Sequence, residues 1–303
     1  MTDLQKRKLG RTGLEVTTLG FGAMELRGAP RGPEITDQEA DRLLNGVLDE
    51  GINFIDTSID YGRSEERIGR FIAHRRSEYY LASKCGCVVG GAPGEHVHTA
   101  ANVRQGIENS LRLLKTEYLD LVQFHRSLTL QEFQAEGALQ EVLNLKAEGK
   151  VRFIGVSGVL PNLDEQIESG VFDAFQIPYS ALQREHEDVI ARAAAAGAGT
   201  IIRGGVARGT PDDWQRSYYM VPSETLQDRW QRANIDQLLE GSSRIDFTLR
   251  FTLSHPGLHT TIVGTRNLEH LRANVRAAKL GPLPAEIVAE TKRRLTQATS
   301  TAA

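Results

Sequence analysis

Four polar residues of this 303-residue chain stand at or just beyond the ends of apolar segments that predict β-strands. They are Asp56 and Tyr61 in NFIDTSIDYG, Lys84 in YYLASKCG and His125 in LDLVQFHR. A carboxylate, a phenol, an ammonium and an imidazole together make a proton-donating group if the fold brings them close. Taken singly, each could be structural: an ion pair, a packed ring or a hydrogen-bonded core histidine. Their recurrence at successive strand ends favours an enzyme.

These side-chain types suit the reduction of a carbonyl group by a hydride. Negative charge develops on the carbonyl oxygen, so a proton donor must stand close to that atom. Tyr61 is the natural donor, although an isolated phenol has a pKa of about 10. At an effective dielectric of about 20, a Lys84 ammonium about 4 Å away would favour phenolate by roughly 4 kcal/mol. Asp56 would keep Lys84 in place and charged, and a neutral His125 could donate a hydrogen bond to the carbonyl.

The segments that carry these residues alternate between strand and helix patterns along the chain. Strands are expected at about 19–24, 53–58, 79–85, 119–124, 152–158, 174–180, 199–205 and 259–265. Helices are expected at about 36–51, 64–75, 99–115, 137–150, 164–169, 186–197, 243–254 and 267–278. Eight strand–helix units predict an α/β fold, a closed (β/α)8 TIM barrel, whose mouth gathers residues from the carboxyl ends of its strands.

Two further segments complete this barrel, which we expect to form one domain over residues 1–303. The opening KRKLGRTGLEVTTLG predicts an N-terminal β-hairpin that plugs one end, and an extra C-terminal helix at about 284–297 would pack outside. The alternative is an open doubly wound sheet. Against it, no strand is followed by GxGxxG opening a helix, with an acidic residue about 20 positions further on.

Composition and charge limit the partners of the chain. A formal net charge of -3 gives no sign of a nucleic-acid surface, and no apolar stretch has the length of a signal-peptide core or a membrane span. A disulfide between Cys85 and Cys87 would be strained, so we expect a reduced, soluble, cytoplasmic protein. No His or Cys stands at zinc-ligand spacing from these thiols, His96 and His98 being the nearest candidates. We therefore expect no metal site, and rather a thiol sensitive to oxidation.

The segment at about 207–242 interrupts the alternation. It is long for a connection between a strand and a helix, and it carries Trp214, Tyr218, Tyr219, Met220 and Trp230. One interpretation is an extra helix or two packed on the barrel wall. The other is a flap that closes on a flat or apolar substrate, which a position after the seventh strand favours.

The motifs GINFIDTSIDYG, LASKCG, YLDLVQFH, RFIGVSG, FQIPYS and IVGTRNLEHLRANV occur in this order. With them the chain resembles the aldo-keto reductase superfamily over nearly its whole length. The resemblance implies a barrel that holds NADPH extended across its carboxyl-terminal face, without a Rossmann domain. It also implies a catalytic tetrad of Asp56, Tyr61, Lys84 and His125. Asp56 would then lie against the cofactor as well.

The resemblance also suggests residues around the nicotinamide and the pyrophosphate. Ser157 and Gln176 would hydrogen-bond the nicotinamide carboxamide, and Asn274 would contact the adenine. Glycines after the seventh strand would let backbone amides approach phosphate oxygens, although such a stretch can equally be an ordinary turn. The remaining residues expected near the cofactor are Gly22, Ala23 and Met24 beside the ring, then Arg203, Gly204, Val206 and Gly209.

A second group of residues, after the eighth predicted strand, bears on whether the cofactor is NADPH or NADH. Gly264, Thr265 and Arg266 open the helix that contains His270 and Asn274. A helix N-terminus with a hydroxyl and a guanidinium suits a dianionic phosphate, which favours NADPH. The alternative is a solvated helix start with a surface arginine.

Two departures from the superfamily pattern bear on specificity. Ser157-Gly158 stands where many relatives have Ser-Asn, a form that some sugar- and lactone-directed members share. Arg203 stands where an aromatic ring usually stacks on the nicotinamide. Its positive charge should disfavour binding of the cationic oxidised nicotinamide ring, or it should recruit an anionic substrate. The structural alternative is that Arg203 pairs with a nearby carboxylate.

The favoured function is therefore an NADPH-dependent reductase of aldehydes or ketones. The alternatives are an NADPH-binding, redox-sensing regulatory subunit with little turnover, or a sugar- or lactone-directed NAD(P)-dependent dehydrogenase. The partner expected is a small carbonyl compound, with no nucleic acid and no membrane. The sequence does not specify the substrate, the direction of the reaction in the cell or the oligomeric state.

Overall fold

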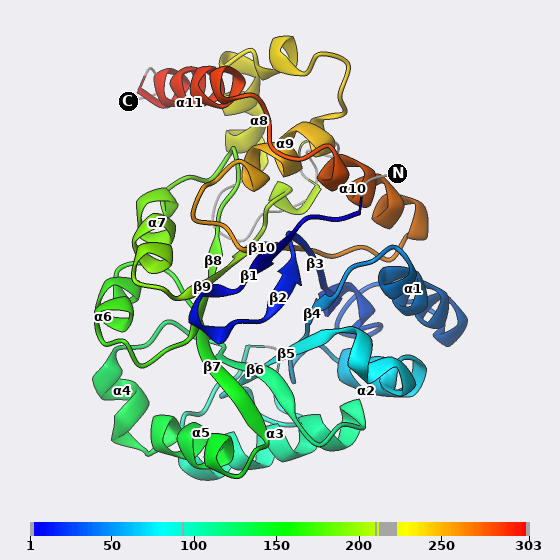
Figure 1. The fold of residues 1–303 in the computed structure, drawn as a ribbon, viewed down its shortest axis with the longest axis vertical. Helices are drawn as coiled ribbons and strands as arrows, with labels where there is room; N and C mark the ends of the chain where they lie inside the picture. The colour runs from blue at the N-terminus through cyan, green and yellow to red at the C-terminus, as the bar shows by residue number, and fades with distance from the viewer. Residues whose placement is uncertain (1–2, 93, 210, 212–222, 301–303) are drawn as a thin grey trace.

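The fold is a closed barrel of eight parallel strands, which confirms the predicted architecture (Figure 1). A computed structural model of the chain describes residues 3–92, 94–209, 211 and 223–300. Around the barrel the strands pair in the order β10, β3, β4, β5, β6, β7, β8, β9. Their bounds are β3 Leu19–Gly22, β4 Phe54–Asp56, β5 Tyr80–Cys85, β6 Leu119–Phe124, β7 Val151–Ser157, β8 Ala174–Pro178, β9 Gly199–Arg203 and β10 Thr260–Val263.

A ring of helices covers the outside of the barrel (Figure 1). Two of these helices begin with a threonine cap. Thr36 caps α1 and forms a capping box with Glu39, and Thr99 caps α3 by accepting from the Asn102 N–H. A helix at α4 was not predicted from the sequence. The bounds are α1 Asp37–Asp49, α2 Ser64–Phe71, α3 Ala100–Leu114, α4 Leu130–Ala135, α5 Ala138–Ala147, α6 Asn162–Glu168, α7 Glu187–Ala195, α9 Arg244–Leu253, α10 Leu268–Lys279 and α11 Ala285–Ser300.

The N-terminal hairpin lies across the amino end of the barrel, as predicted (Figure 1). Strands β1 (Lys6–Lys8) and β2 (Glu15–Thr17) pair antiparallel around the short helix η1 (Gly10–Thr12). Leu9, Leu14 and Val16 pack with apolar side chains of the barrel strands, among them Phe54 and Leu121. The amino end of the barrel is therefore closed by a small apolar core, and a ligand must enter from the other end.

The long segment after β9 contains a packed helix, α8 (Ser223–Arg232). Trp230 is fully buried, its ring edge-on to Phe247, and its Nε1 donates to Asp236 Oδ1 at 2.9 Å. Because α8 packs against α11, this part of the segment follows the packed-helix interpretation. Trp214, Tyr218, Tyr219 and Met220 lie outside the described residues, so the flap hypothesis stays a prediction for them.

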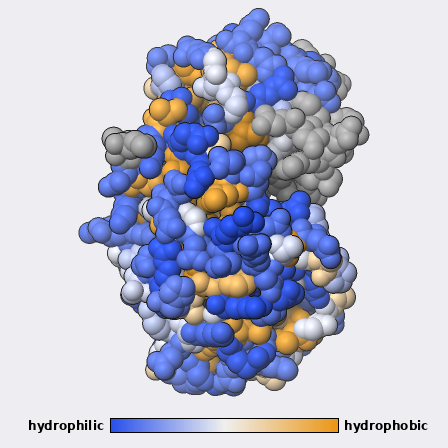
Figure 2. All heavy atoms as spheres, turned by 90° about the vertical axis from the view of Figure 1, so that its right-hand side faces the viewer, coloured by the Kyte–Doolittle hydropathy of each residue, from blue (hydrophilic) through white to orange (hydrophobic). Residues whose placement is uncertain are grey.

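The face of the molecule that Figure 2 draws is mostly hydrophilic. On this face apolar residues form small, separate groups. Among the described residues the large apolar side chains that are exposed lie on different elements: Val97, Leu143, Val171 and Leu280. In the part of the chain that the structure describes, no helix is long and apolar enough to cross a membrane.

Candidate active site

The inside of the barrel is layered along the strands, with apolar residues below and polar residues above. Side chains two positions apart on a strand face the same side. Thus Phe54 precedes Asp56 on β4, Ala82 precedes Lys84 on β5, and Leu121 precedes Gln123 on β6 and His125 just beyond its end. The lower members belong to the apolar core above the hairpin. The upper members come together at the carboxyl ends, where TIM barrels carry their sites.

Asp56 and Lys84 form a buried ion pair. Lys84 Nζ donates to Asp56 Oδ2 at 2.6 Å and to the carbonyl oxygen of Thr57 at 2.8 Å, and both residues are only 1% exposed. Burial is the largest single influence and by itself would lower the Lys84 pKa, but the charges of Asp56, Tyr61 and Asp60 and the hydrogen bond to Asp56 together outweigh it, so the pKa is raised. Lys84 therefore remains an ammonium at neutral pH.

Tyr61 and His125 complete the group of four. Lys84 Nζ lies 5.1 Å from the centre of the Tyr61 ring, whose centroid is 5.8 Å from that of His125 in an edge-to-face arrangement. Burial above all, and then the positive charge of Lys84, lowers the pKa of His125 well below its usual value. His125 is thus neutral at pH 7. The four residues meet, as the sequence hypothesis requires.

The surroundings of His125 favour one tautomer of its ring. Its Nδ1 lies 3.2 Å from Cys87 Sγ and 3.3 Å from Ser58 Oγ. Asp60 Oδ1 lies 3.5 Å from Nδ1 and already accepts from the Ser58 hydroxyl at 2.5 Å, so the Cys87 thiol is available to donate to Nδ1. If Nδ1 accepts, Nε2 carries the proton and can donate to a substrate oxygen.

Gln123 is a residue of the site that the sequence analysis missed. Its Nε2 donates to Asp56 Oδ1 at 2.8 Å, and Gln176 Nε2 donates to the same oxygen at the same distance. The neighbouring Gly155 is required by the next strand and not by Gln123, because a Cβ there would lie 2.5 Å from the carbonyl oxygen of Ala174 but at an ordinary 3.4 Å from Gln123 Cγ. The position of Gln123 two residues before His125, on the same face of the strand, was the available signal.

Ser157 and Gln176 lie on neighbouring strands beside Asp56, where a nicotinamide carboxamide is expected. Ser157 Oγ donates to Gln176 Oε1 at 3.1 Å. Both oxygens keep a lone pair that can accept from an amide NH2, so these two acceptors fit a carboxamide. Gly158 supplies only its backbone, and a Cβ there would lie 3.0 Å from Leu163 and 3.1 Å from Ser127. The Asn of many relatives would need these neighbours to move.

The wall beside this position is made by the end of β3. Gly22 pairs in register with Asp56, and a Cβ on Gly22 would make only ordinary contacts, the nearest at 3.7 Å. Ala23, at the start of the short helix η2 (Ala23–Leu26), is fully buried, while Met24 is partly exposed. A flat ring could therefore approach the end of β3 closely.

The start of α10 is a second polar surface at the mouth. Asn267 caps the helix by accepting from the Glu269 N–H, and Thr265 Oγ1 accepts from the Asn267 N–H at 3.0 Å. The Arg266 side chain is exposed and donates to the carbonyl oxygen of Glu34 at 2.9 Å. His270 is exposed one turn later, and Asn274 is buried. The donors at this helix start fit a phosphate.

The turn after β9 lies between these two regions. Gly204 and Gly209 both have φ values, 73° and 81°, that favour glycine. The Gly209 N–H donates to the Val206 carbonyl at 2.9 Å, so this amide is already used within the turn. Arg203, the last residue of β9, is close enough to His125 for its charge to contribute to the lowered pKa of that ring.

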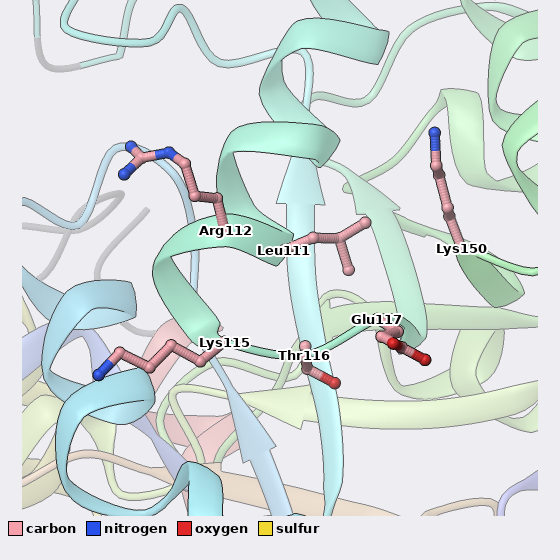
Figure 3. A pocket seen from close by; sticks show the side chains of 6 residues that line it. All are labelled: Leu111, Arg112, Lys115, Thr116, Glu117 and Lys150. Atoms are coloured by element: carbon pink, nitrogen blue, oxygen red, sulfur yellow. The ribbon is translucent and has the colours of Figure 1, made fainter.

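A surface hollow elsewhere has no part in this site. It is lined by Leu111, Arg112, Lys115, Thr116, Glu117 and Lys150. These residues stand just before β6 and β7, at the amino ends of the strands and hence opposite the mouth. Figure 3 shows that their long side chains point away from one another, so no polar groups converge there.

Residues 18–294 match the family model described as Aldo/keto reductase family. The chain belongs to the aldo/keto reductase family. As a member it is an oxidoreductase that acts on small substrates.

Relatives of this aldo-keto reductase span nearly its whole length. It is 28% identical to the "Uncharacterized oxidoreductase YqkF" of Bacillus subtilis, covering 93% of this chain and 94% of that protein. It is also 28% identical to the L-galactose dehydrogenase of Arabidopsis thaliana, over 91% and 89%. Among solved structures, the holo form of aldo-keto reductase AKR11C1 from Bacillus halodurans superposes with a TM-score of 0.81 at 27% identity, covering 97% of this chain and 96% of that one.

The two cysteines of this aldo-keto reductase are both buried, free thiols. Their free state agrees with the strain expected of a bond between them. Burial raises the pKa of Cys85 well above its usual value and that of Cys87 to about 12. Since the thiolate is the form that is oxidised, burial and the raised pKa values disfavour the predicted oxidation sensitivity, which stays a prediction.

Proposed function

We propose that this aldo-keto reductase is an NADPH-dependent enzyme that reduces an aldehyde or ketone to an alcohol, with Tyr61 as proton donor. The observation that carries the proposal is the position of the Lys84 ammonium. It contacts Asp56 on one side and lies 5.1 Å from the Tyr61 ring on the other, in a buried environment. This arrangement supplies a fixed positive charge beside a phenol, which makes the phenol a stronger acid.

When bound, NADPH supplies the hydride that adds to the carbonyl carbon. His125 would donate Nε2–H to the carbonyl oxygen and fix its orientation. Tyr61 would deliver its hydroxyl proton to that oxygen, and the resulting phenolate would be stabilised by Lys84. Asp56, held by Gln123 and Gln176, would keep the ammonium in place. The products would then be the alcohol, NADP⁺ and the Tyr61 phenolate, which regains its proton from water.

The cofactor is proposed to lie from Ser157 and Gln176 to the start of α10. Gly22, Ala23 and Met24 would line the ring, and the turn at Gly204, Val206 and Gly209 would approach the pyrophosphate. Thr265, Arg266 and His270 would surround the additional phosphate that distinguishes NADPH from NADH, since a guanidinium binds phosphate oxygens in pairs. Gly264 precedes them, and Asn274 would contact the adenine.

The decisive experiment replaces the donor hydroxyl alone. Tyr61→Phe should bind NADPH normally and reduce a panel of small aldehydes roughly 10²- to 10⁴-fold more slowly. Tyr118→Phe is the matched control, because Tyr118 lies just before β6 at the opposite end of the barrel. Carbonyl reduction retained by Tyr61→Phe would remove Tyr61 as the acid. Tight NADPH binding without turnover in the wild type would instead support a redox-sensing regulatory subunit.

A sugar- or lactone-directed dehydrogenase is the second candidate. It is favoured by Ser157-Gly158 and by the similarity to the plant L-galactose dehydrogenase. The same residues would act in reverse, with Tyr61 as phenolate taking the alcohol proton. Oxidation of aldoses with NAD⁺ or NADP⁺, faster than reduction of any simple aldehyde in the panel, would select it.

A further inference from the structure

A cluster of metal-ligand side chains lies at the mouth of the barrel, next to the proposed catalytic group. Asp60, Cys87, His96 and His125 each place one ligand atom within 4.8 Å of all the others. They come from three loops or strand ends, after β4, β5 and β6. No metal site is predicted here from the sequence, because these residues have no zinc-type spacing along the chain. The barrel brings them together instead.

Two distances within the cluster match those of a tetrahedral site. His125 Nδ1 lies 3.2 Å from Cys87 Sγ and 3.5 Å from Asp60 Oδ1. Zinc bonds of about 2.0–2.3 Å to nitrogen, sulfur and oxygen place tetrahedral ligand atoms roughly 3.4–3.6 Å apart. The remaining separations are at most 4.8 Å, so shifts of about 1 Å would bring all four atoms around an ion.

His96 is oriented as metal-binding histidines are. Its Nδ1 lies 2.6 Å from the carbonyl oxygen of Gly94. Nδ1 must carry a proton to bond a carbonyl, so Nε2 keeps its lone pair. Nε2 is buried and has no hydrogen-bond partner among the described residues. A bond from the other ring nitrogen to a carbonyl is the usual support of a histidine ligand.

The backbone of the loop after β5 holds the two candidate ligands Cys87 and His96 opposite each other. Cys87 and His96 form an isolated antiparallel bridge, flanked by a bond from the Val97 N–H to the Gly86 carbonyl at 2.8 Å. Asn102 on α3 donates to the carbonyl of Val97 at 2.7 Å and thereby ties the loop to a helix. The pair is thus positioned before any ion binds.

Water reaches the cluster from the mouth. The side chains of His125 and Asp60 are 17% and 13% exposed, and the His96 ring is partly exposed. We propose that Asp60, Cys87, His96 and His125 bind one divalent cation of the zinc class, such as Zn²⁺ or Co²⁺. Two imidazoles and a thiolate select such borderline-soft ions over Mg²⁺ or Ca²⁺. The ion would replace the thiol proton, which passes to solvent.

The test measures metal binding and does not depend on any catalytic activity, so failure of the proposed reduction would leave it standing. The full-length protein, freed of metal, is titrated with Co²⁺ and then with Zn²⁺. One equivalent should bind, with a thiolate-to-cobalt charge-transfer band and the intense visible bands of tetrahedral Co²⁺, and Zn²⁺ should displace it. Spectra of octahedral Co²⁺ without the thiolate band, or no stoichiometric binding, would overturn the proposal.

Variants locate the ion. Cys87→Ser and His96→Gln should each weaken Zn²⁺ binding by about 100-fold or more, and Cys87→Ser should abolish the charge-transfer band. His98→Gln is the matched control, since that ring stacks 6.2 Å from His96 but lies outside the cluster. Because the His96 ring is partly exposed, His96→Gln keeps the test valid if Cys87→Ser fails to fold. Undiminished binding by His96→Gln would show that the ion sits elsewhere.

Discussion

Asp56 Oδ2 and Lys84 Nζ lie 2.6 Å apart in the interior of the barrel, although 28 positions separate the two residues in the chain. The ammonium also contacts the Thr57 carbonyl, and the carboxylate accepts from Gln123 and Gln176. A buried pair of this kind is stable only while every member keeps its partners. Its integrity therefore matters both for the fold and for the proposed chemistry.

Asp56→Asn should destabilise the protein by about 3–5 kcal/mol, because it leaves the Lys84 ammonium buried without its counter-ion. Urea unfolding at pH 7 measures the difference. Asp228→Asn, which breaks an exposed ion pair with Arg232, is the control and should cost less than about 1 kcal/mol. Equal effects of the two changes would contradict the account of the buried pair.

The raised pKa of Lys84 has a consequence at alkaline pH. The contribution of this ammonium to stability is fully present below its unfolded pKa of 10.5 and is lost as the pH rises through the higher folded value. The free energy of unfolding of the wild type should therefore fall above about pH 10.5. In Lys84→Met the free energy of unfolding should fall less steeply above this pH. A pH profile of stability identical to that of the wild type would contradict the role of the Lys84 ammonium.

Glu65 is a buried carboxyl group that destabilises the fold at neutral pH. Burial raises its pKa from 4.5 to about 7, and it accepts from Ser83 Oγ at 2.6 Å. The folded state binds the extra proton between these values, so the cost grows as the pH rises from 4.5 to 7 and is complete above 7. Glu65→Gln should be neutral near pH 4 and stabilising by on the order of 3 kcal/mol at pH 8.

Urea unfolding of Glu65→Gln and wild type at several pH values gives this difference directly. Glu66→Gln is a suitable control, because the neighbouring Glu66 is partly exposed and paired with Arg63 on the surface. A gain from Glu65→Gln that does not change with pH would mean that packing, and not the proton, is responsible.

His125 should not titrate in the working range of the enzyme. Burial, and then Lys84, depresses its pKa well below 6.5, so the ring is neutral at pH 6 to 8. The value of kcat/KM for carbonyl reduction should show no inflection near pH 6.5. An inflection there that disappears in His125→Asn would show that the protonated ring is the active form.

Arg266→Gln should separate the two nicotinamide cofactors. Loss of a charge-assisted contact of about 1.5–3 kcal/mol should raise the Kd of NADPH about 10- to 100-fold and leave that of NADH nearly unchanged. Fluorescence titration measures both constants. Arg272→Gln, on the same helix but paired with Glu50 and Glu269, should have no effect on either.

Arg203→Tyr tests whether the guanidinium at the end of β9 discriminates between cofactor charges. Its positive charge should disfavour the cationic NADP⁺ ring relative to NADPH. Replacement by Tyr should therefore lower the ratio of the Kd of NADP⁺ to that of NADPH, by about 10-fold. If both affinities and the turnover of carboxylated substrates stay the same, Arg203 has a structural role.

The sequence by itself determined the order of strands and helices and four of the residues that meet at the mouth. Strand alternation, the Thr36 and Thr99 caps, and polar residues at strand ends are local signals, because they depend on neighbours along the chain. In a parallel barrel the carboxyl ends of all strands lie at one end, so strand-end residues such as Asp56 and Lys84 follow from the fold class alone.

Only the tertiary structure decided which side chains touch. Contacts between distant segments bring Gln123 to Asp56. Such contacts also bury Trp230 and shield Cys87 from solvent. The cluster of Cys87 and His96 with Asp60 and His125 has no recognisable spacing, because its members come from three successive connections. Burial, which sets the pKa of Glu65 and of His125, is likewise a property of the folded barrel and not of any one segment.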